Sequence, residues 1–172
     1  MKNSSHNRLF RAIWVVMTAV LIAVLIVPSY ASPLRQPHKI WRGFQSDLIR
    51  EAVFGFQMQE VLRVSLQSVR PYFLEAKNMA NPDDAIMQYF HYNRPSVRKV
   101  SSSVMGISTR DKQTGEKGII LEAATITWVM NDRVEVSGAT IYGNQGGIGG
   151  VYQVQFANGK WIVYKFLPKW QS

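Results

Sequence analysis

The chain has 172 residues, 20 lysines and arginines against 11 aspartates and glutamates, a net charge of +9, and no cysteine. The absence of cysteine excludes disulfides, thiolate zinc sites, a cysteine nucleophile and a lipid-modified cysteine anchor. The length leaves room for one domain beyond an export segment, and the apolar content is sufficient for that domain to bury a core. Because the basic residues are scattered along the chain, we expect no nucleic-acid partner.

Residues 1–31 predict a signal peptide or a membrane anchor. Three basic residues precede an uncharged apolar run at residues 12–27, which Pro28 closes. The small residues Ser29 and Ala31 suit a signal peptidase, which would cleave after Ala31. In the alternative interpretation, residues 12–34 stay in the inner membrane as an uncleaved anchor. Both interpretations place the rest of the chain in a bacterial periplasm.

Residues 32–39 contain two prolines and predict an extended connector, so the folded domain is expected over residues 40–172. Apolar residues recur at helical spacing over residues 40–66, which predicts one long amphipathic helix. Pro71 ends this helix, and we expect residues 72–74 to form a short helical turn beneath it.

A second helix start follows at Asn81, which is a favourable N-cap, with Pro82 at the first helical position. We expect this helix to end near Tyr92. Its inward-facing side chains would be Ile86, Met87, Tyr89 and Phe90.

Beyond Pro95 the apolar period changes to two, which is typical of strands. The expected strands cover residues 98–110, 118–131, 133–144, 151–157 and 161–167. Asn158-Gly159 between two alternating runs predicts a tight hairpin. The fold class is therefore α+β, with a long helix and shorter helices packed on a curved antiparallel sheet.

This order of elements, over residues 41–167, resembles the cone-shaped fold of nuclear transport factor two and the ketosteroid isomerases. The resemblance implies a pocket between the helices and the sheet, in which the enzymes of that family place an Asp–His or Asp–Tyr pair. A cystatin-like domain, with a helix on a sheet, is the alternative fold.

Three residues are candidates for lining such a pocket. His91 is the one histidine inside the domain, and Glu122 shares one face of its strand with Trp128. A carboxylate buried there without a partner would have a raised pKa. If the opposite face of the strand is the buried one, Glu122 points away from the core, and the sequence leaves both registers open. We assign no catalytic residue, metal ligand or cofactor.

Residues 143–150 are rich in glycine, but they join two strands and lead into no helix, so the pattern does not indicate a phosphate site. We expect either a flexible hairpin loop or a loop that orders on contact with a partner. Asn144, Gly146 and Gly147 are therefore candidate interface residues. Trp41 and Trp170 join them, because tryptophan is enriched at binding hot spots. The alternative for Trp170 is that this terminal side chain folds back onto its own domain.

The basic N-terminus, the single hydrophobic segment, Pro33-Leu34-Arg35 and Asn144-Gln145-Gly146-Gly147 together resemble the TraE-like inner-membrane scaffold subunits of type IV secretion and conjugation machines. In that family the last motif has proline where this chain has Gln145. The resemblance implies a non-enzymatic scaffold that self-associates and contacts other envelope or secretion-machine proteins. The alternative is a soluble periplasmic protein that binds a small apolar ligand, or an isomerase-like or dehydratase-like enzyme.

Overall fold

In the computed structural model of the chain, the described residues are 39–64, 70–144 and 146–172, and they belong to one compact unit, Gln36–Ser172. The predicted signal peptide or anchor and the connector up to residue 38 lie outside them. Within the described ranges, no helix combines the length and the apolar character needed to cross a membrane.

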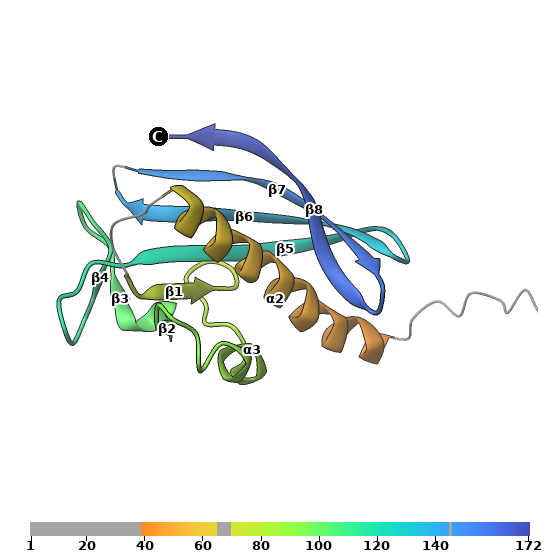
Figure 1. Ribbon diagram of the computed structural model, residues 1–172, viewed down its shortest axis with the longest axis horizontal. Helices are drawn as coiled ribbons and strands as arrows, with labels where there is room; N and C mark the ends of the chain where they lie inside the picture. Colours follow the sequence, from red (N-terminus) through yellow and green to blue (C-terminus); the bar gives the residue numbers. More distant parts are fainter. Residues whose placement is uncertain (1–38, 65–69, 145) are drawn as a thin grey trace, which may run out of the picture. The chain divides into compact units, whose positions relative to one another are not determined.

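The long helix is confirmed. Helix α2 spans Lys39–Val64 and lies across one face of the sheet (Figure 1). Its apolar side chains repeat at helical spacing, and Ile49, Val53 and Phe54 are completely buried.

Helix α3, Asp84–Tyr89, is shorter than expected and runs beside α2. The predicted N-cap is wrong: Asp83 precedes the helix, and Asn81 Oδ1 instead accepts a hydrogen bond from the Ser101 amide at 3.0 Å. Phe90 is buried as expected, whereas Tyr89 is 67% exposed. A helix of six residues presents only a narrow face to the core, so Tyr89 remains outside it.

The helical turn predicted at residues 72–74 is wrong, because strand β1, Tyr72–Glu75, occupies this position. It lies between strands β2, Val97–Lys99, and β5, Ile119–Met130, and pairs in parallel with both. All four β1 residues are buried. A strand covered on both faces reads as a continuous apolar run without a period of two, which explains the incorrect prediction.

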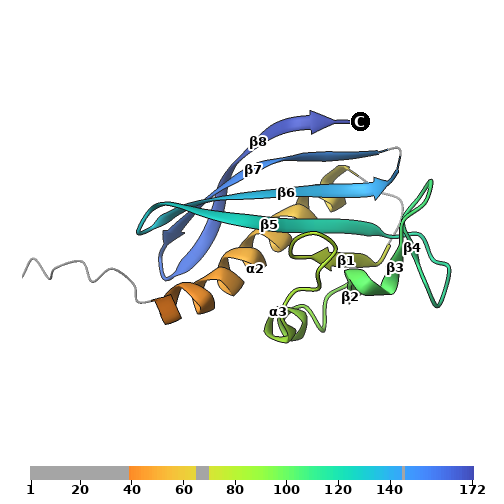
Figure 2. The ribbon, with the colours of Figure 1, turned by 180° about the vertical axis from the view of Figure 1, so that it is seen from behind.

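The sheet has six strands in the order β2-β1-β5-β6-β7-β8 (Figures 1 and 2). Strands β6, Arg133–Gly143, β7, Gly146–Ala157, and β8, Lys160–Gln171, follow β5 as an antiparallel meander. The α+β class and the curved sheet are confirmed. The sheet is mixed rather than purely antiparallel, because β1 and β2 add a parallel edge.

The predicted strand at residues 98–110 is interrupted. After β2 the chain forms the 3-10 turn Val100–Ser102, then β3, Ser103–Val104, and β4, Arg110–Asp111, which form a separate two-stranded sheet. Three consecutive serines favour local hydrogen bonds, and Ser103 Oγ indeed donates to the Val100 carbonyl at 2.8 Å.

Asn158 and Gly159 have φ values of 52° and 78°, so the tight hairpin predicted between β7 and β8 is confirmed. The prediction of a glycine-rich loop at residues 143–150 is wrong, because most of this stretch belongs to strands. Strand β7 already begins at Gly146 and pairs with β6 from there to Gln155. Among the described residues of this stretch, only Asn144 lies in a turn between the two strands.

The main core lies between α2 and one face of the sheet, with Phe54, Leu74, Leu121 and Tyr152 among its buried members. A smaller cluster of Phe73, Val100 and Ile120 lies on the opposite face, at the β1 end of the sheet. The space between helix and sheet is thus filled by large side chains.

Candidate functional site

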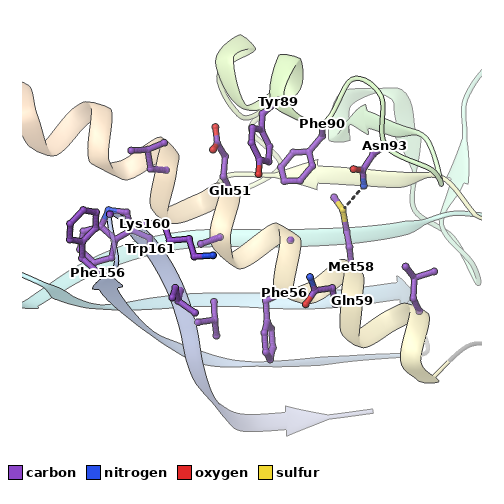
Figure 3. A pocket seen from close by; sticks show the side chains of 17 residues that line it. Glu51, Phe56, Met58, Gln59, Tyr89, Phe90, Asn93, Phe156, Lys160 and Trp161 are labelled. Atoms are coloured by element: carbon purple, nitrogen blue, oxygen red, sulfur yellow. Dashed lines mark hydrogen bonds between the residues drawn. The ribbon is translucent and has the colours of Figure 1, made fainter.

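An open groove follows the side of α2 that faces away from the sheet. Its volume is about 580 Å³, and α2 forms its floor between two walls. Figure 3 shows Tyr89 and Phe90 on one side of α2, and Phe156, Lys160 and Trp161 on the other. We call these sides the α3 wall and the hairpin wall.

The floor is formed by α2 residues spaced four and three apart in alternation. They are Leu48, Ala52, Gly55, Gln59 and Leu62. This spacing produces a straight stripe along a helix, because two steps cover seven residues or about two turns. The stripe is mainly apolar or small, and Leu62 is 48% exposed.

The walls also expose apolar side chains. Tyr89 is 67% exposed on the α3 wall, while Phe156 and Ile162 are 39% and 37% exposed on the hairpin wall. A contiguous apolar surface with polar edges is typical of a binding site. These exposed side chains lie outside the buried core of the described residues, so core packing does not account for their exposure.

Gly55 lies in the middle of the groove floor. A Cβ atom built on Gly55 would meet no atom within 4 Å. Glycine inside a helix costs roughly 1 kcal/mol relative to alanine. Since no described part of the chain approaches this position, the missing side chain leaves free room above α2.

The groove also contains two opposite charges. Glu51 lies on the α3 side of the floor and Lys160 begins the hairpin wall (Figure 3). Burial, followed by the nearby carboxylate of Asp47, raises the pKa of Glu51. Among the described residues, neither Glu51 nor Lys160 has an ion pair.

The three residues predicted to line an interior pocket do not come together. Glu122 lies beside Glu75, its register partner on β1, on the sheet face opposite α2. Burial, and then the charge of Glu75, raises the pKa of Glu122. His91 is exposed just after α3 and packs edge to face on Tyr92, with ring centroids 4.8 Å apart.

Trp128 lies on the α2 face of the sheet, although Glu122 of the same strand lies on the other. A bulge between Ala123 and Ile126 inserts an extra residue and exchanges the two faces of β5. Trp128 then packs edge to face against Trp161, with centroids 5.7 Å apart. The even-numbered face predicted from the sequence therefore does not continue through the strand.

Hydrogen bonds next to the bulge connect the sheet to α2. Gln57 is 1% exposed, and its Nε2 donates to the carbonyls of Glu122 at 2.9 Å and Ala139 at 3.1 Å. The hydroxyl of Tyr152 lies 3.0 Å from the same nitrogen. Polar and aromatic side chains thus fill the space between α2 and the sheet at this point.

Asn144, Gly147 and Trp170, three of the residues predicted at an interface, lie in the turn between β6 and β7, in β7 and in β8. Asn144 is exposed in the β6–β7 turn, and its amide donates to the Gly106 carbonyl at 2.8 Å. The indole of Trp170 covers Gly147 and Gly149, where an added Cβ would come within 3.1 Å and 2.4 Å of the ring. Trp170 is still 48% exposed, whereas the side chain of Trp41 lies outside the described part.

Among the described residues, no group of three His, Asp or Glu side chains is placed to hold a metal ion. The sequence reasoning missed the groove. The alternating four-and-three spacing from Leu48 to Leu62 was the available signal, but it merged with the wider apolar face of the long helix.

The chain matches no profile of a known protein family, no curated protein and no solved structure. The groove and the filled core are therefore the observations on which a function can be argued.

Proposed function

We propose that this chain is a non-enzymatic envelope protein, a scaffold or assembly subunit of a machine of the secretion or conjugation type. It would act through contacts with other envelope proteins and with copies of itself. The observation that carries the proposal is the open apolar groove on α2, combined with a core in which large buried side chains of the described residues pack between α2 and the sheet.

The filled core argues against chemistry of the ketosteroid isomerase kind. Such chemistry needs an acid or base aimed into a hollow beside its partner. Here Glu122 lies on the opposite sheet face and His91 is exposed, so neither reaches the space beneath α2. The groove, by contrast, exposes apolar groups in the way that protein interfaces do.

The proposed location of the protein follows from the sequence. The apolar run at residues 12–27 would deliver the domain to the periplasm, either anchored in the inner membrane or released after Ala31. The cone-type fold and the TraE-like group remain the proposed relatives, on the order of elements and the short motifs given above.

Cell fractionation combined with intact mass tests the proposal. We expect the protein in the envelope, beginning either at Met1 or at Ser32, and cross-linked there to other envelope proteins. A cytosolic protein that retains residues 1–31, or turnover of a substrate by the purified protein, would contradict it.

The groove also favours a second candidate function. A volume of about 580 Å³ is within the range of small-molecule sites, so a soluble periplasmic protein that binds an apolar ligand remains the alternative. Extraction with organic solvent of protein purified from cells would release such a ligand, and mass spectrometry would detect it. A scaffold would release none in stoichiometric amount.

A further inference from the structure

The loop between β3 and β4 exposes three apolar side chains to solvent. Val104 is 51% exposed, Met105 is 38% exposed and Ile107 is 80% exposed. Residues 104–109, which we call the tip loop, project at the end of the sheet that lies away from the start of α2 (Figures 1 and 2). The groove on α2 is lined by none of these residues, so the tip loop is a second apolar surface.

The tip loop is held in place by the neighbouring turn between β6 and β7. The Asn144 amide donates to the Gly106 carbonyl at 2.8 Å. The Thr109 amide donates to the Tyr142 carbonyl at 3.0 Å. Between these two bonds, a Cβ atom on Gly143 would lie 2.4 Å from a carbonyl oxygen of the tip loop, so only glycine allows the two backbones to approach this closely. The backbone that carries the apolar side chains is therefore already ordered, and binding through it loses little conformational entropy.

Two cations lie directly beside the apolar residues. Val104 pairs with Arg110 in the small sheet of β3 and β4, and Arg110 in turn forms a bridge with Lys117. Residues that pair directly point to the same side of a ladder, so the three side chains form one row, and all three are exposed. Lys112 adds a third exposed positive charge, while Glu116 is the one exposed carboxylate between Val104 and Lys117. The surface next to the tip loop is therefore positively charged.

An apolar tip with cations beside it is complementary to the surface of an anionic lipid bilayer. The apolar side chains would enter the boundary between headgroups and acyl chains, while the cations would stay at the level of the lipid phosphates. A stable contact with a protein needs about 800 Å² of surface on each partner. Three side chains on one projecting loop provide less than this, whereas lipid molecules can surround a small convex tip from all sides.

We propose that the tip loop inserts into the surface of an anionic membrane, with Ile107 deepest and with Arg110 and Lys117 against the lipid phosphates. This inference goes beyond the proposed function, which attaches the chain to a membrane only through residues 12–34. The folded domain would have a membrane contact of its own, whether the N-terminal segment stays as an anchor or is removed after Ala31.

A single cysteine at position 107 tests the insertion, because the natural chain has no cysteine. The full chain with Ile107→Cys would be labelled with an environment-sensitive fluorophore and reconstituted into vesicles of phosphatidylethanolamine and phosphatidylglycerol. We expect a blue shift of the emission, and quenching by lipids that carry a nitroxide on the acyl chain. Since Ile107 is 80% exposed, the variant should fold normally, as circular dichroism would verify.

Val129→Cys is the matched control for position 107. Val129 is also apolar and is 56% exposed. Strand β5 begins beside the tip loop, where the Gly118 amide donates to the Thr109 carbonyl at 3.0 Å. Val129 lies ten residues further along this strand, or about 30 Å away at 3.3 Å per residue. A fluorophore at position 129 should therefore stay in water and escape the nitroxide.

Neutralising the two cations tests the electrostatic contribution. In the labelled Ile107→Cys chain, Arg110→Gln combined with Lys117→Gln should lower the ratio of inserted to free tip loops about tenfold or more, since each basic residue near an anionic surface favours binding about fivefold. Vesicles of phosphatidylcholine alone should have a similar effect. Arg133→Gln combined with Lys77→Gln is the matched control, because it removes the same two charges from exposed positions at the start of β6 and after β1, and it should change nothing.

Three results would overturn the inference. They are a fluorophore at position 107 that emits as it does in water, equal quenching at positions 107 and 129, and insertion that survives removal of both cations. A fluorophore that is protected in native envelope membranes but remains in water on protein-free vesicles would assign the tip loop to a protein partner, and would overturn the inference as well. In each case an envelope location with cross-links to other proteins would leave the proposed function standing.

Discussion

Replacing Gln57 by methionine tests whether hydrogen bonds, rather than apolar contact alone, attach α2 to the sheet. Methionine has nearly the same length and shape as glutamine, so it fills the same space without an amide. The variant removes the donor from the Glu122 and Ala139 carbonyls, which accept from Gln57 Nε2 at 2.9 Å and 3.1 Å.

The magnitude follows from the burial of these groups. Each buried carbonyl that loses its donor costs about 1–3 kcal/mol. Gln57 Oε1 is buried without a hydrogen-bond partner, and its removal returns a similar amount for one group. The net expectation is a loss of about 2 kcal/mol in the free energy of unfolding, or about 5–10 °C in Tm for a domain of this size.

Urea unfolding followed by circular dichroism measures the change. Gln59→Met is the matched control, since Gln59 is exposed two residues further along the same helix and should stay within about 0.5 kcal/mol of the wild type. A Gln57→Met protein that is as stable as the wild type would show that the amide makes no net contribution, and that apolar packing alone holds the helix.

Three further predictions concern residues of the strands β7, β4 and β5. Gly149→Ala should cost about 1–3 kcal/mol because its Cβ would meet the Trp170 ring, and urea unfolding should find most of this cost removed in a Trp170→Ala background. Hydrogen bonds, first of all from the Thr114 amide, lower the pKa of Asp111 to about 2. A lowered pKa gives stability that is present above the unfolded value of 3.8 and lost as the pH falls toward 2, so Asp111→Asn should flatten this acid limb in a pH series of thermal melts. Burial raises the pKa of Glu122, so its ionisation in the folded state costs stability as the pH rises, and Glu122→Gln should exceed the wild type in Tm at pH 7 but not below its ordinary pKa of 4.5.

The sequence was sufficient to predict elements in which an apolar repeat continues over many residues and buries a single face. It predicted α2 from a repeat sustained over many turns, and the β7–β8 hairpin from Asn158-Gly159. Local patterns failed where tertiary contacts decide the outcome. Strand β1 is buried on both faces and shows no period of two, so nothing in its four residues separates a strand from a helical turn.

The candidate site was less predictable than the fold. The faces of β5 depend on one inserted residue at its bulge, which the alternation of side chains cannot reveal in advance. The glycines of β7 resembled a loop because the ring that covers them comes from Trp170, more than twenty positions later in the chain. The groove needed the positions of α3 and β8 relative to α2, and no local pattern contains these.

The contact of Trp170 with two glycines has a consequence for how this sequence can change over time. The ring of Trp170 fills the volume that side chains at Gly147 and Gly149 would otherwise occupy, so a side chain at either glycine would compete with the ring for the same space. A larger residue at position 149 would be acceptable only with a smaller one at position 170. Among natural variants of this chain, we therefore expect the two positions to covary in size.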